Sequence, residues 1–536
     1  MTTRRLLLLA GLAGLFAPAA RADVKPHPLF SDNMVLQRGT TCPIWGTADP
    51  GEAVTVSVDV ASGSGKSTIR IGTTASSDGW WMVRVGTFQA GDKLTVTIAG
   101  KNTVTLKNVL AGDVWLCSGQ SNMEWRVKQL TKDDQGKKVA AEAANPNIRL
   151  YDVPNRPAPE PKTDFPVNAK AGQGVWLECT PETVANFSAV GYFFGRDLQK
   201  ALNVPIGLIA SDWGGTPAEA WTSRQGLLAE PSLRHYVEKL DAATKGFDAE
   251  KAKAKYEADL AKWKAAAAKA KEEGKPPPRR PQPPGTGGVN QNSPTALYNG
   301  MIAPLVPFAI TGAIWYQGES NAGRAYEYRT LMPALIRDWR ARWGYEFPFL
   351  IVQLAPFRGG PSGVDYAELR DAQLHTAQVL PRVGLAVITD VGEETDIHPQ
   401  KKEPVGARLA LAARAIAYGQ PVEFSGPVLQ GVRFEGDKAV LSFLHVDGGL
   451  VAKGGELTGF TVAGPDQKFQ PAKAEIRGDT VVVSSEKVPN PVAVRFGWAN
   501  FPKPELNFFN KAGLPAVPFR TDNFPLTTMP KPDAKK

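Results

Sequence analysis

The middle of the chain alternates between short, continuous apolar runs and longer segments with helical periodicity, and this alternation constrains the fold most strongly. Continuous apolar runs are typical of strands in a parallel sheet that is buried on both faces. Helical segments such as 326–343 and 405–418 fit the crossover connections of such a sheet. The apolar runs lie at 109–117, 206–210, 309–315, 349–354 and 383–388. We therefore predict an α/β core over residues 109–424.

Shorter strand-like segments flank this core on both sides. Residues 54–60 and 94–98 alternate between apolar and polar side chains, and turn residues separate the two segments. We expect an N-terminal β domain over 23–108, a C-terminal β domain over 425–523 and a tail over 524–536.

One glycine-rich segment in the first β domain, Gly-Ser-Gly-Lys-Ser-Thr at 63–68, resembles half of a phosphate-binding loop. The complete motif requires a glycine five residues before Gly65, and that position is Val60. A strand-like run follows, where a phosphate loop would need a helix N-terminus. We predict a hairpin turn at this point.

The segment 238–285 does not fit the core. Its first part is rich in Ala, Lys and Glu, and its end is rich in proline. This composition favours a solvated helix or helical hairpin with an extended return, and the alternative is a partner-binding device.

The first 22 residues predict a secretory signal peptide. Arg4 and Arg5 precede an apolar stretch at 6–16, and Ala-Arg-Ala at 20–22 is a cleavage signal. No later stretch approaches the ~18 uninterrupted apolar residues of a membrane span. We therefore expect an exported protein, periplasmic or secreted, that leaves the membrane after cleavage.

The formal net charge of +9 says little about partners. The excess of basic residues lies in the signal peptide, in the 238–284 insertion and in the last six residues, so the folded domains are close to neutral. We expect no nucleic-acid partner. The 43% hydrophobic and 21% charged composition excludes a mostly disordered chain.

The three cysteines, Cys42, Cys117 and Cys179, allow either one disulfide with a free thiol or three buried thiols. They form no C-x-x-C or His/Cys cluster, and the five histidines are dispersed. We expect no metal and no cofactor.

Four polar clusters each follow one of the predicted core strands. Because the carboxyl ends of parallel strands meet at one edge of a sheet, these clusters are expected to lie together. They offer a serine at a helix N-terminus, a glycine pair, an amide side chain, and a histidine beside a carboxylate. The clusters are Gly-Gln-Ser-Asn-Met at 119–123, Trp-Gly-Gly-Thr at 213–216, Gln-Gly-Glu-Ser-Asn at 317–321 and Asp-Ile-His-Pro at 396–399.

These four clusters, in this order, resemble the sequence blocks of the sialate O-acetylesterase family of carbohydrate esterases, within the SGNH hydrolase superfamily. The resemblance extends from about residue 26 to 523 and includes segments 292–301 and 513–522. It implies a three-layer α/β/α core of flavodoxin-like type with flanking β domains.

The resemblance also implies the catalytic roles. Ser121 is the nucleophile and His398 its general base, which fits the general need of a serine hydroxyl for a neighbouring imidazole. The oxyanion hole uses the Ser121 amide, a glycine amide from Gly214 or Gly215, and the Asn321 side chain.

The acidic partner of the histidine is less well defined by the sequence. Many enzymes of the superfamily place Asp three residues before the histidine, and that position is Thr395. In an extended segment, residues two apart point to the same side, so Asp396 can reach the His398 ring. Glu393, Glu394 or a main-chain carbonyl are the alternatives.

Four further residues of the clusters are candidates for substrate binding. Gln120 and Gln317 can bind sugar hydroxyls or satisfy loop backbone, and Glu319 can contact substrate or hold its block by hydrogen bonds, the second being favoured. Trp213, like Trp221, is either a core aromatic or a sugar-stacking surface.

The sequence thus predicts an exported serine esterase that removes O-acetyl groups from carbohydrates through an acetyl-Ser121 intermediate. One alternative is an acetylesterase for plant cell-wall glycans such as xylan or xyloglucan. An alternative of another class is a catalytically inactive carbohydrate-binding protein. The oligomeric state stays open.

Overall fold

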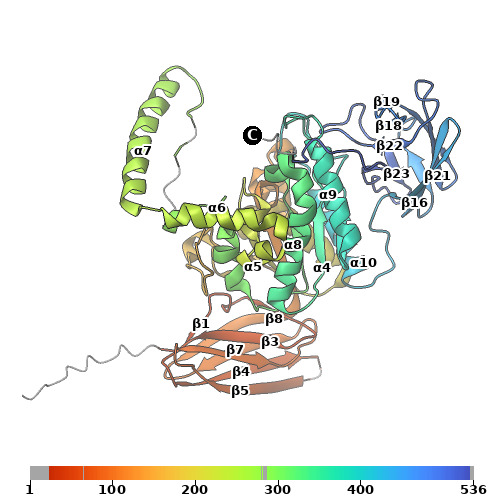
Figure 1. Cartoon of the computed structure of the whole chain (residues 1–536). Coiled ribbons are helices and arrows are strands. Elements are labelled where there is room, and N and C mark those ends of the chain that lie inside the picture. Colours follow the sequence, from red (N-terminus) through yellow and green to blue (C-terminus); the bar gives the residue numbers. More distant parts are fainter. Residues whose placement is uncertain (1–22, 64, 279, 282–285, 531–536) are drawn as a thin grey trace, which may run out of the picture.

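The computed structural model describes residues 23–530 apart from 64, 279 and 282–285. The predicted signal peptide at 1–22 and the last six residues of the predicted tail lie outside the described residues. Along the chain, a β sandwich is followed by an α/β core and a second β region (Figure 1).

The core contains a mostly parallel sheet whose strands are buried along their whole length in β11, β12 and β13. Only β10 pairs antiparallel with its neighbour in this path. Its strand order is β10 (Trp176–Cys179), β9 (Asn145–Asp152), β11 (Ile206–Asp212), β8 (Thr103–Gly119), β12 (Gly312–Tyr316), β13 (Phe349–Val352) and β14 (Val383–Ala386). Each of the five predicted apolar runs overlaps one of these strands, which confirms the α/β core.

Two pairs of helices cover the sheet. Helix α4 (Ala189–Leu202) packs against α10 (Glu403–Ile416), and α8 (Ala325–Trp343) packs against α9 (Asp365–Val379) (Figure 1). Strand β14 contacts both α9 and α10, so it is covered by helices of both pairs. This is the expected three-layer arrangement.

Strand β8 is the switch point of the sheet. The chain leaves β8 toward β9 and β11 on one side, and later adds β12, β13 and β14 on the other. Ligand sites of open α/β sheets lie at the carboxyl end of the strand where the order reverses. The residues directly after Gly119 occupy that place.

The same strand joins the core to the β sandwich. The first part of β8 pairs antiparallel with β7 (Lys93–Ala99), and its last part pairs in parallel with β11 and β12. The boundary expected after residue 108 therefore falls inside one unbroken strand. One hydrophobic core runs through both parts, whereas the C-terminal region has a separate core.

The glycine-rich segment is a hairpin turn, as expected. Strands β4 (Ala53–Ser62) and β5 (Gly65–Thr74) are antiparallel, with Ser62 paired to Gly65. The second sheet of the sandwich consists of β1 (Lys25–Pro26), β3 (Cys42–Thr47) and β6 (Trp80–Val85).

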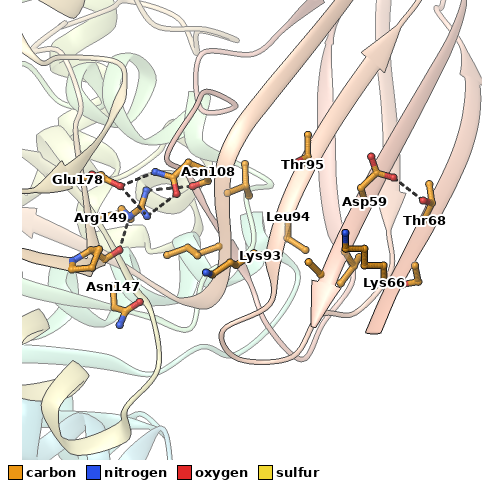
Figure 2. Close-up of a pocket in the computed structure, with 16 residues that line it drawn as sticks. Asp59, Lys66, Thr68, Lys93, Leu94, Thr95, Asn108, Asn147, Arg149 and Glu178 are labelled. Carbon is orange, nitrogen blue, oxygen red and sulfur yellow. Dashed lines mark hydrogen bonds and ion pairs between the residues drawn. The ribbon is translucent and has the colours of Figure 1, made fainter. Parts of the chain in front are cut away.

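A buried arginine fastens the sandwich to the edge of the core. Arg149 in β9 donates to the Asn33 carbonyl oxygen. It also donates to the carbonyl oxygens of Asn108 and Pro146, and it lies 3.3 Å from Glu178 (Figure 2). An open cleft of about 880 Å³ is lined by Asn108, Arg149 and Glu178 and by the sandwich strands β4, β5 and β7. None of the predicted site residues lines it.

The insertion is helical. Helix α6 (Arg234–Lys245) ends at Gly246, and α7 (Ala249–Glu272) extends away from the core with no buried residue (Figure 1). The indole of Trp263 donates to the Pro278 carbonyl at 2.7 Å, so the start of the proline-rich segment lies beside the helix. The described part of the predicted insertion is therefore helical, and it is solvated along α7 but not at Leu240 of α6, which is buried with Val289 and Ala296.

The C-terminal region is built from small antiparallel sheets, as expected. The described part of the predicted tail contacts the core, because Glu368 in α9 accepts from the Thr527 and Thr528 amides at 2.6 and 3.0 Å. One sheet has the order β15 (Val428–Glu435), β16 (Lys438–Leu444), β21 (Thr480–Ser484), β20 (Lys473–Arg477). A second has the order β19 (Gln470–Pro471), β18 (Phe460–Ala463), β22 (Ala493–Phe496), β24 (Phe519–Arg520).

All three cysteines are unpaired and buried. Burial raises the pKa of the Cys42 and Cys179 thiols to about 12, and raises that of Cys117 as well. Of the two alternatives left by the sequence, the structure has three buried thiols.

Within the described part of the chain, none of the helices has both the length and the apolar character of a bilayer span.

Candidate active site

The predicted nucleophile and base meet at the end of β8. Ser121 is the first residue of the short helix α1 (Ser121–Glu124), and its Oγ lies 2.9 Å from Nε2 of His398, 277 residues further on. This is hydrogen-bond distance between a hydroxyl nucleophile and its base. Both side chains are half-buried, so a substrate can reach them.

The chain bends sharply just before the nucleophile. Gly119 has a φ of +143°, and a Cβ at this position would lie 2.2 Å from the Tyr316 carbonyl oxygen of the neighbouring strand. Only glycine fits this close approach. The turn directs the next residues, Gln120 and Ser121, out of the sheet.

The imidazole is held between an aromatic face and a carboxylate. The Trp125 ring stacks on His398 with centroids 4.7 Å apart and planes at 20°. The Oδ1 atom of Asp396 lies 3.8 Å from Nδ1 of His398 and accepts the backbone N–H of the same histidine at 2.8 Å. Asp396 is thus adjacent to the ring but beyond hydrogen-bond distance from it.

The two alternative carboxylates are engaged elsewhere. Glu393 accepts the Gln400 backbone N–H at 3.0 Å. Glu394 accepts from Lys503 at 2.6 Å and from Arg358 at 3.4 Å. Neither interaction involves the imidazole, which leaves Asp396 as the carboxylate at the ring.

Burial lowers the pKa of His398, and the nearby Lys402 ammonium lowers this pKa further. The Asp396 carboxylate acts in the opposite direction and raises it. A neutral imidazole accepts a proton, so the lowered pKa suits a general base.

The two glycines of the second cluster differ in their hydrogen bonding. The Gly214 N–H donates to Oε2 of Glu124 at 2.6 Å. Gly215 is exposed, has a φ of +73° and has open space beside its Cα. Within the described chain, the N–H groups of Ser121 and Gly215 have no acceptor and are available to an oxyanion.

Asn321 is buried and partly engaged. Its Oδ1 accepts the Ala218 backbone N–H at 2.9 Å and Nε2 of Gln317 at 2.7 Å. Its Nδ2 donates to Oε2 of Glu219 at 2.9 Å. An amide nitrogen carries two hydrogens, so one remains for a substrate oxygen.

The other candidates have different environments. Gln317 is fully buried, donates to the Thr216 carbonyl at 3.2 Å and accepts from Tyr328 at 2.9 Å, which is a structural role. The Gln120 Oε1 atom accepts the Ser320 N–H at 3.3 Å. Trp213 is partly exposed beside the glycine pair, whereas Trp221 is fully buried.

Glu319 lies in a buried polar network that the sequence did not reveal. Its Oε1 accepts Nδ2 of Asn122 at 2.6 Å, and Oδ1 of Asn122 accepts from the ammonium group of Lys402. This supports the structural role favoured for Glu319. Asn122 lies inside a recognised block, but nothing in the sequence distinguishes Lys402 from the exposed Lys401 beside it.

A second group missed by the sequence lies behind Gly214. Burial raises the pKa of Glu124, Asp152 and Asp212. The Asp152 carboxyl also raises the pKa of Glu124, and both Glu124 and Asp152 raise that of Asp212. Arg126 contacts Asp152 at 3.3 Å. Three carboxyl groups whose pKa values are raised therefore lie near the turn that carries Ser121.

A serine and a histidine at hydrogen-bond distance, at the switch point of a three-layer α/β/α core, are typical of SGNH-type hydrolases. Residues 285–415 match the family model described as carbohydrate esterase, sialic acid-specific acetylesterase. The rat sialate O-acetylesterase is 30% identical, over 91% of this chain and 93% of that protein. The human sialate O-acetylesterase is 30% identical, over 78% of this chain and 75% of that protein.

A solved structure is also similar. The crystal structure of a carbohydrate acetylesterase from Xanthomonas citri is 37% identical, has a TM-score of 0.76 and covers 94% of this chain and 100% of its own. The chain belongs to the sialate O-acetylesterase family of carbohydrate esterases. The resemblance recognised in its sequence blocks is confirmed, and the protein is an esterase.

Proposed function

We propose that this protein removes O-acetyl groups from carbohydrates through an acetyl-Ser121 intermediate. The observation that carries the proposal is the 2.9 Å contact between Ser121 Oγ and His398 Nε2 beside unoccupied backbone amides. The same contact argues against the inactive carbohydrate-binding alternative.

The first half of the reaction transfers the acetyl group to the protein. Ser121 Oγ attacks the acetyl carbonyl carbon while His398 Nε2 takes the hydroxyl proton. The negative oxygen that forms accepts hydrogen bonds from the Ser121 and Gly215 amides and from Asn321 Nδ2. When the intermediate collapses, the C–O bond to the sugar breaks and the imidazolium protonates the departing sugar oxygen.

The second half releases acetate. Water gives a proton to His398 Nε2 and attacks the acetyl-Ser121 carbonyl. The second tetrahedral intermediate collapses, and the imidazolium returns its proton to Ser121 Oγ. The carboxylate of Asp396 stabilises the imidazolium in each half, because opposite charges a few ångströms apart attract even near the surface.

The acetylated sugar is the finer part of the proposal. The relatives named for sialate support an acetylated sialic acid. One observation favours the alternative of a neutral sugar such as an acetylated xylan or xyloglucan side chain. The basic side chains described beside the nucleophile are already engaged, Arg126 by Asp152 and Lys402 by Asn122, so they offer little to a sialate carboxylate.

A panel of substrates tests both parts. Acetate release is measured from 9-O-acetyl sialic acid, acetylated xylo-oligosaccharides and acetylated xyloglucan oligosaccharides, with the wild type and Ser121→Ala. We expect the variant to lose at least ~10³-fold in kcat on every substrate that the wild type hydrolyses. A variant with wild-type turnover contradicts the mechanism, and release from sialic acid alone contradicts the plant-glycan alternative.

We also propose that the protein is exported, because its first 22 residues have the pattern of a secretory signal peptide. Expression with the full N-terminus, followed by sequencing of the mature protein, is expected to find Asp23 as the first residue in the periplasmic or secreted fraction. An uncleaved chain that stays in the cytoplasm contradicts this.

A further inference from the structure

A lysine is buried directly behind the catalytic histidine. Lys402 lies four residues after His398, at the N-terminus of α10, and has 0% of its surface exposed. Its ammonium group donates to Oδ1 of Asn122. The same nitrogen lies 5.9 Å from the ring centroid of Trp125, the residue that stacks on the imidazole, and 5.5 Å from that of Tyr316.

Asn122 connects this lysine to both halves of the catalytic pair. It follows Ser121 in α1, and its Nδ2 donates to the Ile397 carbonyl oxygen at 3.0 Å and to Oε1 of Glu319 at 2.6 Å. The nucleophile turn and the histidine loop therefore share one side-chain amide. Lys402 fixes the orientation of that amide, because an ammonium group can only donate and must face the amide oxygen.

The charges around Lys402 are only partly balanced. Burial lowers the pKa of Lys402 to about 7, while Glu319, Asp396 and Glu393 raise it. Burial also raises the pKa of Glu319, whose Oε2 is buried without a hydrogen-bond partner. Tyr316, also at this site, has its pKa raised by burial and stays neutral. Below neutral pH the lysine is therefore a cation whose charge acts on the His398 imidazole.

We propose that Lys402 is a positioning residue that aligns Ser121 and His398 through Asn122 and whose positive charge keeps the imidazole in its proton-accepting form. The inference rests on the proposed serine-esterase function. Like charges disfavour each other, so a protonated His398 beside a protonated Lys402 is costly. Asp396 acts against this effect from the exposed side of the ring.

The test is the pH dependence of kcat/KM for a small acetyl ester. Lys402→Met removes the charge and the donor, and Lys402→Gln removes the charge but keeps a donor for Asn122. We expect the acid limb of both variants to move by about 0.5 pH unit or more toward higher pH, because the His398 pKa rises. We expect kcat in the alkaline plateau, where the wild-type lysine is largely neutral, to fall more in Lys402→Met than in Lys402→Gln.

The matched control is Lys401→Met, which removes the same charge from the exposed neighbouring residue. It is expected to leave the acid limb in place. A purely structural role for Lys402 lowers activity and melting temperature in both variants without moving the acid limb, and that result overturns the proposal.

A measurement on the wild type covers the case in which neither variant folds. The His398 imidazole is titrated by NMR, with His398→Gln to assign its signal. A midpoint at or above the ordinary 6.5 overturns the proposal. If Ser121→Ala retains activity, the proposed function fails. If Ser121→Ala is inactive and the Lys402 variants keep the wild-type acid limb, only the role of Lys402 fails.

Discussion

The Gly214 amide donates to the Glu124 carboxylate at 2.6 Å, across 90 residues of sequence. This contact holds the glycine pair against the helix that carries the nucleophile. A Cβ on Gly214 would lie 3.2 Å from Ser121 Cβ and 2.9 Å from Glu124 Oε2, so the two segments are in close contact. Because the Gly214 N–H is engaged, we expect the Gly215 amide, which has no acceptor in the described chain, to be the glycine donor of the oxyanion hole.

Gly215→Ala is expected to lower kcat by about 10- to 100-fold, because an alanine disfavours the φ of +73° and displaces the amide donor. The measurement is steady-state kinetics on an acetyl ester. Gly436→Ala is the matched control, since Gly436 also has a positive φ (+60°) and open space, in the β15–β16 hairpin far along the chain. If kcat falls equally in the two variants, the loss in Gly215→Ala is due to backbone strain and not to the amide donor.

Asn321→Ala is expected to lower kcat by roughly 10²–10³-fold with a smaller change in KM, as is usual for loss of one oxyanion donor. It also leaves the buried Ala218 N–H without its acceptor, which costs about 1–3 kcal/mol of unfolding free energy. Kinetics and denaturant unfolding measure the two effects separately. A folded variant with wild-type kcat would show that Asn321 is not a donor of the oxyanion hole.

Asp396→Asn is expected to lower kcat by about 10- to 100-fold, less than for a fully hydrogen-bonded triad acid, because the carboxylate is half-exposed and 3.8 Å from the ring. The Asp396 charge raises the His398 pKa, so its removal moves the acid limb of kcat/KM to lower pH. The shift has the opposite sign to that expected for Lys402→Met. Glu394→Gln is the control, and an equal loss in that variant would show that the orienting acid is misassigned.

His27 predicts an acid-dependent loss of stability. Its ring is buried against Trp45, and burial lowers its pKa from 6.5 to about 4. The unfolded chain takes up this proton at higher pH than the folded chain does, so the stability is fully present above 6.5 and is lost as the pH falls toward 4. The single site accounts for at most about 3 kcal/mol.

The measurement is urea unfolding at about pH 7.5 and about pH 4.5 for the wild type and His27→Asn. Asparagine can keep an acceptor near the Leu29 N–H, which donates to His27 Nδ1 at 3.2 Å, but it does not titrate. We expect the variant to be less stable than the wild type at the higher pH. We also expect its free energy of unfolding to fall less between the two pH values. If the free energy of unfolding falls by the same amount in the wild type and in the variant, His27 is not the titrating group.

The strands and the two residues proposed as the catalytic pair could be picked out from the sequence because each is encoded locally. A buried parallel strand is a continuous apolar run, and Ser121 and His398 lie in short blocks with recognisable neighbours. The boundary between sandwich and core could not be predicted in this way. The exposed Lys107 and Asn108 interrupt the apolar pattern, yet β8 continues through them.

The supporting groups depend on long-range register. Glu124 reaches Gly214 only because β8 and β11 are parallel neighbours that end at the same level, Gly119 beside Asp212. Lys401 and Lys402 are identical in the sequence, and only the start of α10 decides which of them is buried. Such residues follow from the fold and not from the local pattern.

Strand β8 also determines which parts of the molecule unfold together. Because one strand is both the last strand of the sandwich and the central strand beneath the nucleophile, and one apolar core spans both, neither part can melt without exposing the other. The C-terminal sheets have an apolar core of their own. In a calorimeter the protein should behave as two cooperative units, and the catalytic turn belongs to the one that begins in the N-terminal sandwich.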